Sequence, residues 1–299
     1  MAEKENLQLQ DKHSPSTLKI IQELGKVRIS LPVALSALTG YALCNHTFGW
    51  EAFFLFWGVF LMSCCSGTLN HWQEYKTDAL MPRTKDRPIP SGKISPRYAL
   101  LTAIGYFIVG GTILLTCLPV AAFVTSVVTL LAYNAFYTPL KKVTAFAVIP
   151  GSLVGALPPY IGWLAAGGSI LNVDIFFVAL FFFLGQIPHF WLLLLMFGKE
   201  YKLAGYPSLN DILSDNQIKR LSFTWILATI SGALVILLTI IVSKTIAIIL
   251  LLYTFYLLFS TSSAIFFRHD IKVRPTFFKL NFLYLFMMIA LIIDGLTRS

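Results

Sequence analysis

Nine long stretches of this sequence are nearly free of charged residues, and they constrain the fold more than any other feature. A helix needs about 20 apolar residues to cross the hydrocarbon core of a bilayer. Backbone polar groups must be satisfied within that core, so a helix is the natural spanning element. We therefore predict an all-α, polytopic membrane protein with nine spanning helices at about 27–46, 51–70, 97–117, 120–138, 146–166, 173–197, 221–242, 245–267 and 277–296.

The composition argues against a soluble helical protein. Hydrophobic residues make up 57% of the 299 residues, and charged residues make up only 12%. A soluble domain carries about 25% charged residues. Two of the links between spans are very short, so we expect antiparallel hairpins at 97–117 with 120–138 and at 221–242 with 245–267.

The basic residues indicate how the chain is oriented. A net charge of +9 would suggest a nucleic-acid partner in a soluble protein, but in a membrane protein Lys and Arg collect in cytoplasmic loops. With the N-terminus in the cytoplasm, all of the 23 basic residues except Lys244 and Arg298 fall on the cytoplasmic side. We therefore expect a cytoplasmic N-terminus, a C-terminus outside, an active site facing the cytoplasm and no nucleic-acid partner.

The N-terminal segment is polar and acidic and contains no arginine before Arg28, which is unlike a mitochondrial transit peptide. We expect a multi-pass protein of the bacterial cytoplasmic (inner) membrane, with the first span acting as an uncleaved anchor. Residues 1–16 are predicted to form a disordered tail. Residues 17–26 place apolar side chains on one stripe and predict a short helix lying on the membrane surface. Residues 17–299 are expected to form a single membrane domain.

The strongest chemical signal is a polar segment that follows the second span. Asn70, Glu74 and Asp78 are spaced by four residues, which places them on one face of a helix. Carboxylate and amide oxygens suit Mg²⁺, which completes its coordination with water and substrate phosphates. Basic residues that can bind phosphate follow at once: Arg83, Lys85, Arg87 and Lys93. The segment predicts a metal-bridged diphosphate site or, alternatively, a solvated loop whose acids and bases pair with each other.

Two more polar clusters lie near span ends. His189 and Glu200 are eleven residues apart, so they face the same way if the sixth helix continues. Glu200 is a candidate ligand for a second Mg²⁺, whereas His189 either contacts substrate or packs in the bundle.

The other cluster contains Tyr133 and Tyr137, followed by Lys141 and Lys142. These tyrosines are also typical of the aromatic belt at a membrane interface. Downstream, the proline pair at 158–159 predicts a break or kink in the fifth span.

Four ordered motifs resemble those of a known family. They are K-V-R-I-S-L-P-V-A-L-S-A-L-T-G-Y (26–41), N-H-W-Q-E-Y-K-T-D-A-L-M-P-R-T-K-D-R-P-I-P-S-G (70–92), Y-T-P-L-K-K (137–142) with I-P-G-S-L-V-G-A-L-P-P-Y-I-G-W, and P-H-F-W (188–191) with E-Y-K-L-A-G-Y-P (200–207). Together they resemble the UbiA superfamily of intramembrane prenyltransferases. The G-A-L-P-P and P-H-F-W elements resemble the branch that farnesylates heme.

The resemblance implies a nine-helix UbiA-type bundle around a cavity that opens toward the cytoplasm and the lipid. The implied Mg²⁺ ligands are Asn70, Glu74, Asp78 and Glu200. The implied groups that neutralise the leaving diphosphate are Arg83, Arg87 and Lys141 or Lys142. The implied substrate contacts are Tyr133, Tyr137, Lys142, His189 and Lys93. Some phenylalanines of the sixth span are expected to add aromatic walls, while most of them face lipid. Glu74 stands where many members have Asp, and Lys199 replaces an acid, so one ion is expected and a second stays open.

The implied reaction transfers a farnesyl group from farnesyl diphosphate to a vinyl group of heme B (protoheme IX), with addition of water, giving heme O and diphosphate. A heme A synthase or a terminal oxidase is the implied recipient. Two alternatives are a UbiA-type enzyme acting on a quinone precursor or another aromatic acceptor, and a membrane transporter. A transporter would place charges deep within several spans, whereas here the charges gather at one surface.

Overall fold

The computed structural model describes residues 16–267 and 270–298, so almost all of the predicted disordered tail (1–16) lies outside the described residues. Within these ranges the chain is helical and contains no strand. The helices are α2 (Thr17–Leu24), α3 (Val27–Asn45), α4 (Trp50–Asp78), α5 (Pro96–Cys117), α6 (Val120–Leu131), α7 (Thr138–Leu140), α8 (Val148–Ala165), α9 (Val173–Leu203), α10 (Asp215–Thr239), α11 (Lys244–Phe266) and α12 (Val273–Leu296). A π-helix, η1 (Ala132–Tyr137), joins α6 to α7, and two short 3₁₀ turns are η2 (Ala145–Ala147) and η3 (Leu209–Asp211).

The nine predicted spans are confirmed. In the described part of the chain, nine helical segments are long and apolar enough to cross a membrane, with α6, η1 and α7 forming one of them and η2 and α8 another. The main difference is length, because α4 runs on to Asp78 and α9 to Leu203. The sequence prediction counted apolar residues only, whereas the polar ends of these helices lie against other parts of the protein.

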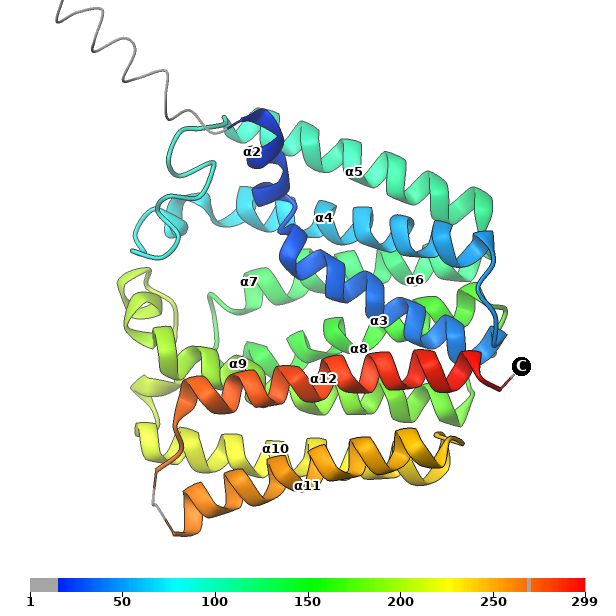
Figure 1. Cartoon of the computed structure of the whole chain (residues 1–299). Helices are drawn as coiled ribbons and strands as arrows, with labels where there is room; N and C mark the ends of the chain where they lie inside the picture. Colours follow the sequence, from blue (N-terminus) through cyan, green and yellow to red (C-terminus); the bar gives the residue numbers. More distant parts are fainter. Residues whose placement is uncertain (1–15, 268–269, 299) are drawn as a thin grey trace, which may run out of the picture.

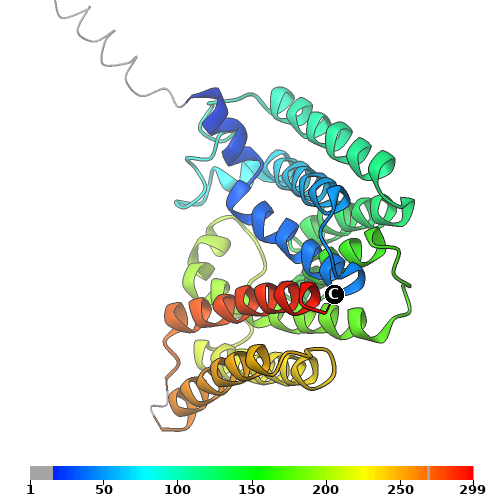
Figure 2. The same cartoon turned by 45° about the vertical axis from the view of Figure 1, so that its right-hand side comes forward.

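The spans lie side by side in one bundle (Figure 1). The loop 79–95, the segment 141–147 and the loop 204–214 gather at one end, near α2, whereas the described C-terminus lies at the opposite end. The predicted hairpins are present, since α5 contacts α6 and α10 contacts α11. Figure 2 shows α10 and α11 as an outer pair, remote from α5 and next to α9 and α12.

Two glycines let α3 and α8 approach until their backbones touch. A Cβ at Gly162 would lie 1.7 Å from the carbonyl oxygen of Ala37, and one at Gly40 would lie 1.9 Å from that of Pro159. Any side chain there would force the helices apart. Of the break or kink predicted at Pro158 and Pro159, the break is absent, because α8 continues through both prolines to Ala165.

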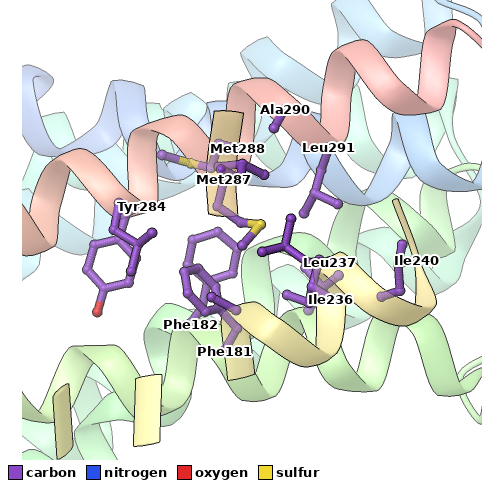
Figure 3. Close-up of a cluster of buried hydrophobic side chains, with 14 of the residues drawn as sticks. Phe181, Phe182, Ile236, Leu237, Ile240, Tyr284, Met287, Met288, Ala290 and Leu291 are labelled. Atoms are coloured by element: carbon purple, nitrogen blue, oxygen red, sulfur yellow. The ribbon is translucent and has the colours of Figure 1, made fainter. Parts of the chain in front are cut away.

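The largest apolar cluster lies between α9, α10 and α12 (Figure 3). Phe181 and Phe182 of α9 pack on Tyr284 of α12, with ring centroids 5.7 and 5.9 Å apart. These two phenylalanines therefore belong to the interhelical core, which corrects the expectation that the Phe-rich span lines the cavity. Phe176 is exposed at the bundle surface, where a spanning helix faces lipid.

Candidate active site

The polar face of α4 turns into the bundle. Asn70, Glu74 and Asp78 are 2%, 4% and 1% exposed, so the predicted face of the helix is confirmed as one buried stripe. Ionisable groups at such depth need partners, because burying an unpaired charge is costly. Each of the three side chains has one.

Glu74 is the centre of the cluster. The Nζ of Lys141 lies 2.6 Å from Oε1 and 2.7 Å from Oε2 of Glu74. The hydroxyl of Tyr206 donates to Oε1 at 3.1 Å, and the amide Nδ2 of Asn70 donates to Oε2 at 2.9 Å. Burial, followed by the charge of Glu74, raises the pKa of Tyr206, so its hydroxyl keeps the proton that it donates.

Lys26 completes the cluster from the start of α3. Its Nζ donates to Oδ1 of Asn70 at 2.6 Å, and Nδ2 of Asn70 also donates to Thr138 Oγ1 at 3.3 Å. Burial and then the positive charges of Arg87 and Lys141 lower the pKa of Lys26 to about 7.

Asp78 holds the loop that follows α4. Arg87 Nη1 lies 2.7 Å from Asp78 Oδ2, and the hydroxyl of Thr84 donates to the Asp78 backbone carbonyl at 2.8 Å. The loop also reaches α9, because the backbone N–H of Arg83 donates to Glu200 Oε2 at 3.0 Å. The guanidinium of Arg83 lies over the ring of Phe197 in α9. The structure thus brings the two predicted acidic regions to opposite sides of one loop.

The π-helix η1 places the tyrosine cluster. Its buried Asn134 is clamped to α4: Ser66 donates to Asn134 Oδ1 at 2.7 Å, and Gln73 Nε2 donates to the Asn134 carbonyl at 2.8 Å. The rings of Tyr133 and Tyr137 are 5.5 Å apart. π-Helical turns inside α-helices are frequent at functional sites because they re-aim the residues that follow.

The structure separates the remaining predicted basic residues. Lys142 is exposed, so of the adjacent pair only Lys141 reaches Glu74. Lys85 is also exposed. Lys93 donates to the carbonyl of Asp86 at 2.9 Å and lines a groove with α2 and α5 instead of joining the α4 cluster.

His189 lies apart from the acidic cluster. Its Nδ1 is 2.9 Å from Oδ1 of Asn281 on α12, and its ring centroid is 4.7 Å from that of Phe277. The α9 helix does continue from His189 to Glu200, as predicted. The two side chains nevertheless have different partners, one on α12 and the other in the loop after α4.

An apolar crevice opens beside Lys141. Its walls include Tyr137, Val148, Phe190, Leu194 and Tyr201, from η1, α8 and α9. Tyr137 forms part of the wall of this crevice. The centroid of its ring lies 5.8 Å from the ammonium of Lys141. A Cβ at Gly151 would lie 2.4 Å from that ring, so the glycine makes room for it.

The donor set fits a hard cation bound together with an anion. Two carboxylates and one amide oxygen lie on the buried face of α4, and they are contacted by Lys26, Lys141 and Arg87. Oxygen donors of this kind suit Mg²⁺, and the lysine and arginine side chains beside them suit phosphate oxygens. No three His, Cys, Asp or Glu side chains of the described residues lie close enough to share one ion, so Glu200 does not join Glu74 and Asp78 in a single cluster.

Three contacts were not predicted as site contacts. Lys26, Thr138 and Tyr206 reach the cluster from α3, α7 and the loop after α9. All three residues stand within the family motifs of the sequence, and the position of Lys26 directly before an apolar run was an available signal. The partners of these three side chains depend on how the helices pack, so they cannot be predicted from residue spacing.

Comparison with known proteins identifies the class. The sequence matches the UbiA prenyltransferase family over residues 33–286, and the chain belongs to that family. It is 36% identical over 190 residues to the protoheme IX farnesyltransferase of Oleidesulfovibrio alaskensis, covering 64% of this chain and 67% of that protein. It is 38% identical over 188 residues to the protoheme IX farnesyltransferase of Geobacter sulfurreducens, covering 62% and 68%.

Solved structures share the fold. A structure of digeranylgeranylglyceryl phosphate synthase superposes with a TM-score of 0.74 at 16% identity, covering 94% of this chain and 99% of that one. A UbiA homologue from Archaeoglobus fulgidus bound to GPP and Mg²⁺ gives a TM-score of 0.71 at 15% identity, covering 93% and 99%. These similarities confirm the predicted UbiA-type bundle.

Proposed function

We propose that this protein transfers a farnesyl group from farnesyl diphosphate to a vinyl group of heme B, giving heme O and diphosphate. The observation that carries the proposal is the buried cluster on α4, in which two carboxylates and an amide face three basic side chains beside an apolar crevice. An amphiphile with a phosphorylated head and an isoprenoid tail fits both parts. The heme acceptor is favoured by the two bacterial relatives described as protoheme IX farnesyltransferases.

Asn70, Glu74 and Asp78 would hold one Mg²⁺ ion, as the donor set allows. When bound, the metal supplies a positive charge that stabilises the departing diphosphate. A bound Mg²⁺ is also described for the Archaeoglobus homologue. Glu200 is occupied by the backbone N–H of Arg83 and lies beside the exposed Lys199, which favours one ion over two.

The cations of the site would act on the donor. The C–O bond of farnesyl diphosphate breaks, and its electron pair leaves with the diphosphate. Lys141 and Arg87 would meet the growing charge on that group, and fixed cations in a dry site are effective because they need no reorganisation. Lys26 would bind the same group from α3.

The aromatic walls would act on the farnesyl cation. Tyr137 already presents its ring to the Lys141 ammonium, and a ring face attracts an allylic cation in the same way. The vinyl group of heme B then attacks this cation and forms a C–C bond. Water adds to the resulting porphyrin-side cation and loses one proton, which completes the hydroxyethylfarnesyl group.

The protein would lie in the bacterial inner membrane with its N-terminus and site in the cytoplasm. The support is the predicted charge distribution together with the structure, in which the loops that carry the site share one end of the bundle. Heme O is an amphiphile that stays in the bilayer, so a heme A synthase or a terminal oxidase would collect it there. Reporter fusions at residues 143 and 243 should give opposite orientations.

The direct test uses purified protein in detergent with Mg²⁺, farnesyl diphosphate and heme B. We expect the mass of heme O to appear, Asp78→Asn to abolish it, and the exposed Asp86→Asn to leave it unchanged. Prenylation of an aromatic acid acceptor without any product from heme would refute the heme assignment. Full activity of Asp78→Asn would refute the role of the α4 cluster.

A further inference from the structure

The last helix brings an amide against the histidine of α9. Oδ1 of Asn281 lies 2.9 Å from Nδ1 of His189. A carbonyl oxygen can only accept a hydrogen bond, so Nδ1 carries the hydrogen and donates it. The lone pair of the imidazole is therefore on Nε2, and no described residue forms a hydrogen bond with that nitrogen.

The surroundings hold the imidazole in place. Phe277 lies against one side of the His189 ring, with the two centroids 4.7 Å apart. One turn farther along α12 from Asn281, Tyr284 (labelled in Figure 3) packs so closely on α9 that a Cβ at Gly185 would lie 1.8 Å from its hydroxyl oxygen. The α9–α12 contact is therefore close-packed next to the hydrogen bond between His189 and Asn281.

We propose that Asn281 is a positioning residue for the heme acceptor: it fixes the His189 tautomer whose Nε2 ligates the iron of heme B. This inference rests on the proposed function. Metal-ligating histidines commonly donate their other ring N–H to an oxygen, which fixes the orientation and the basicity of the ligand. Imidazole is a suitable ligand for iron, and the ring of Phe277 offers an apolar surface to a porphyrin.

The arrangement assigns a role in recognition to α12, a part of the chain without any recognised motif. His189 is three turns, about 16 Å along the helix axis, from Glu200, which binds the loop that carries Arg87. The iron and the diphosphate would accordingly occupy different levels of the bundle. Heme could then bind before the prenyl donor without competing for the cations of the α4 cluster.

Binding of two porphyrins to the full-length protein in detergent, without farnesyl diphosphate, tests the inference. Ferric heme B is followed through its Soret band, and metal-free protoporphyrin IX is followed through its fluorescence. We expect Asn281→Leu to weaken heme binding about tenfold or more and to shift the Soret band. Binding of the metal-free porphyrin should not change, because it has no iron to ligate.

Three further variants distinguish a positioning role of Asn281 from a packing role. Asn281→Asp keeps an oxygen that accepts the Nδ1 hydrogen, so it should restore both the affinity and the ligated spectrum. Tyr284→Phe alters the same interhelical contact without touching His189 and should leave both porphyrins bound as in the wild type. His189→Ala should lose the ligated spectrum altogether.

Three outcomes would overturn the inference. Equal losses of affinity for heme and for metal-free porphyrin in Asn281→Leu would show that Asn281 only supports packing. A His189→Ala protein with an unchanged Soret band, while the wild type still makes heme O, would remove the iron contact and leave the proposed function standing. A wild-type protein that binds no heme and prenylates another acceptor would overturn both.

Discussion

Replacing Lys141 by methionine should destabilise the protein, because the buried carboxylate of Glu74 loses its counter-charge. Methionine keeps much of the length of the lysine stem but removes the ammonium that lies 2.6 Å from Glu74 Oε1. Glu74 would then keep only the neutral donors Asn70 and Tyr206 as partners. A buried carboxylate without its counter-charge is strongly unfavourable.

The expected cost follows from the burial of the pair. At 2.6 Å and an effective dielectric constant of about 20, the attraction is about 6 kcal/mol, and dehydration of both ions offsets much of it. Removing one partner of a buried pair costs about 3–5 kcal/mol. Because the Lys141 side chain is 19% exposed and Glu74 retains two donors, we expect the lower end, about 3 kcal/mol.

A double-mutant cycle isolates the interaction. The free energy of unfolding would be measured by SDS titration in mixed micelles for Lys141→Met, Glu74→Gln and the double variant. We expect the double variant to lose less than the sum of the single losses, with a coupling of about 2 kcal/mol. Lys142→Met is the matched control, since that lysine is adjacent and exposed, and it should change stability by less than about 0.5 kcal/mol.

Additive losses, within about 0.5 kcal/mol, would refute the buried ion pair. An equal loss in Lys142→Met would refute the assignment of Lys141 as the inward-facing residue. A separate readout is the affinity for farnesyl thiodiphosphate, which Lys141→Met should weaken about tenfold or more, because a charge-assisted hydrogen bond contributes about 1.5–3 kcal/mol.

Three other perturbations have defined outcomes. Gly162→Ala places a Cβ against the Ala37 carbonyl and should lower the free energy of unfolding by about 3 kcal/mol or more. The control Gly105→Ala enters open space and should be neutral or slightly stabilising. Equal effects of the two variants would contradict the close α3–α8 contact. Tyr206→Phe removes a donor to Glu74 and should lower unfolding free energy by about 1–2 kcal/mol, and an unchanged SDS midpoint would contradict that hydrogen bond. Removal of Mg²⁺ with EDTA should abolish heme O formation in a turnover assay while leaving the Soret band of bound heme unchanged; activity in EDTA would exclude the metal.

The spans and the acidic face were predictable because each depends on a short-range periodicity. Apolar runs alone predicted all nine spanning segments, and a spacing of four placed Asn70, Glu74 and Asp78 on one face. The ends of α4 and α9 were predicted too short, because polar residues there contact other segments of the protein: Asp78 pairs with Arg87, and Glu200 accepts from the backbone N–H of Arg83.

The partners of those residues could not be predicted, because they are set by packing across the bundle. Lys26 reaches Asn70 from 44 residues away, and Tyr206 reaches Glu74 from 132 residues away. The sequence also left Lys141 and Lys142 as equal candidates, and only the fold directs the first of them inward. The contact of His189 with α12 had no signal, since a single asparagine in an apolar helix forms no pattern.

The π-helical turn at Ala132–Tyr137 makes the site depend on the length of a helix as well as on its residues. Such a turn accommodates one residue more than the α-helix around it. Each residue of an α-helix advances the side chains by about 100°, so the same residues wound as a plain α-helix would turn everything that follows out of phase. Thr138 and Lys141 would then point away from Glu74, although every chemical group of the site would still be present.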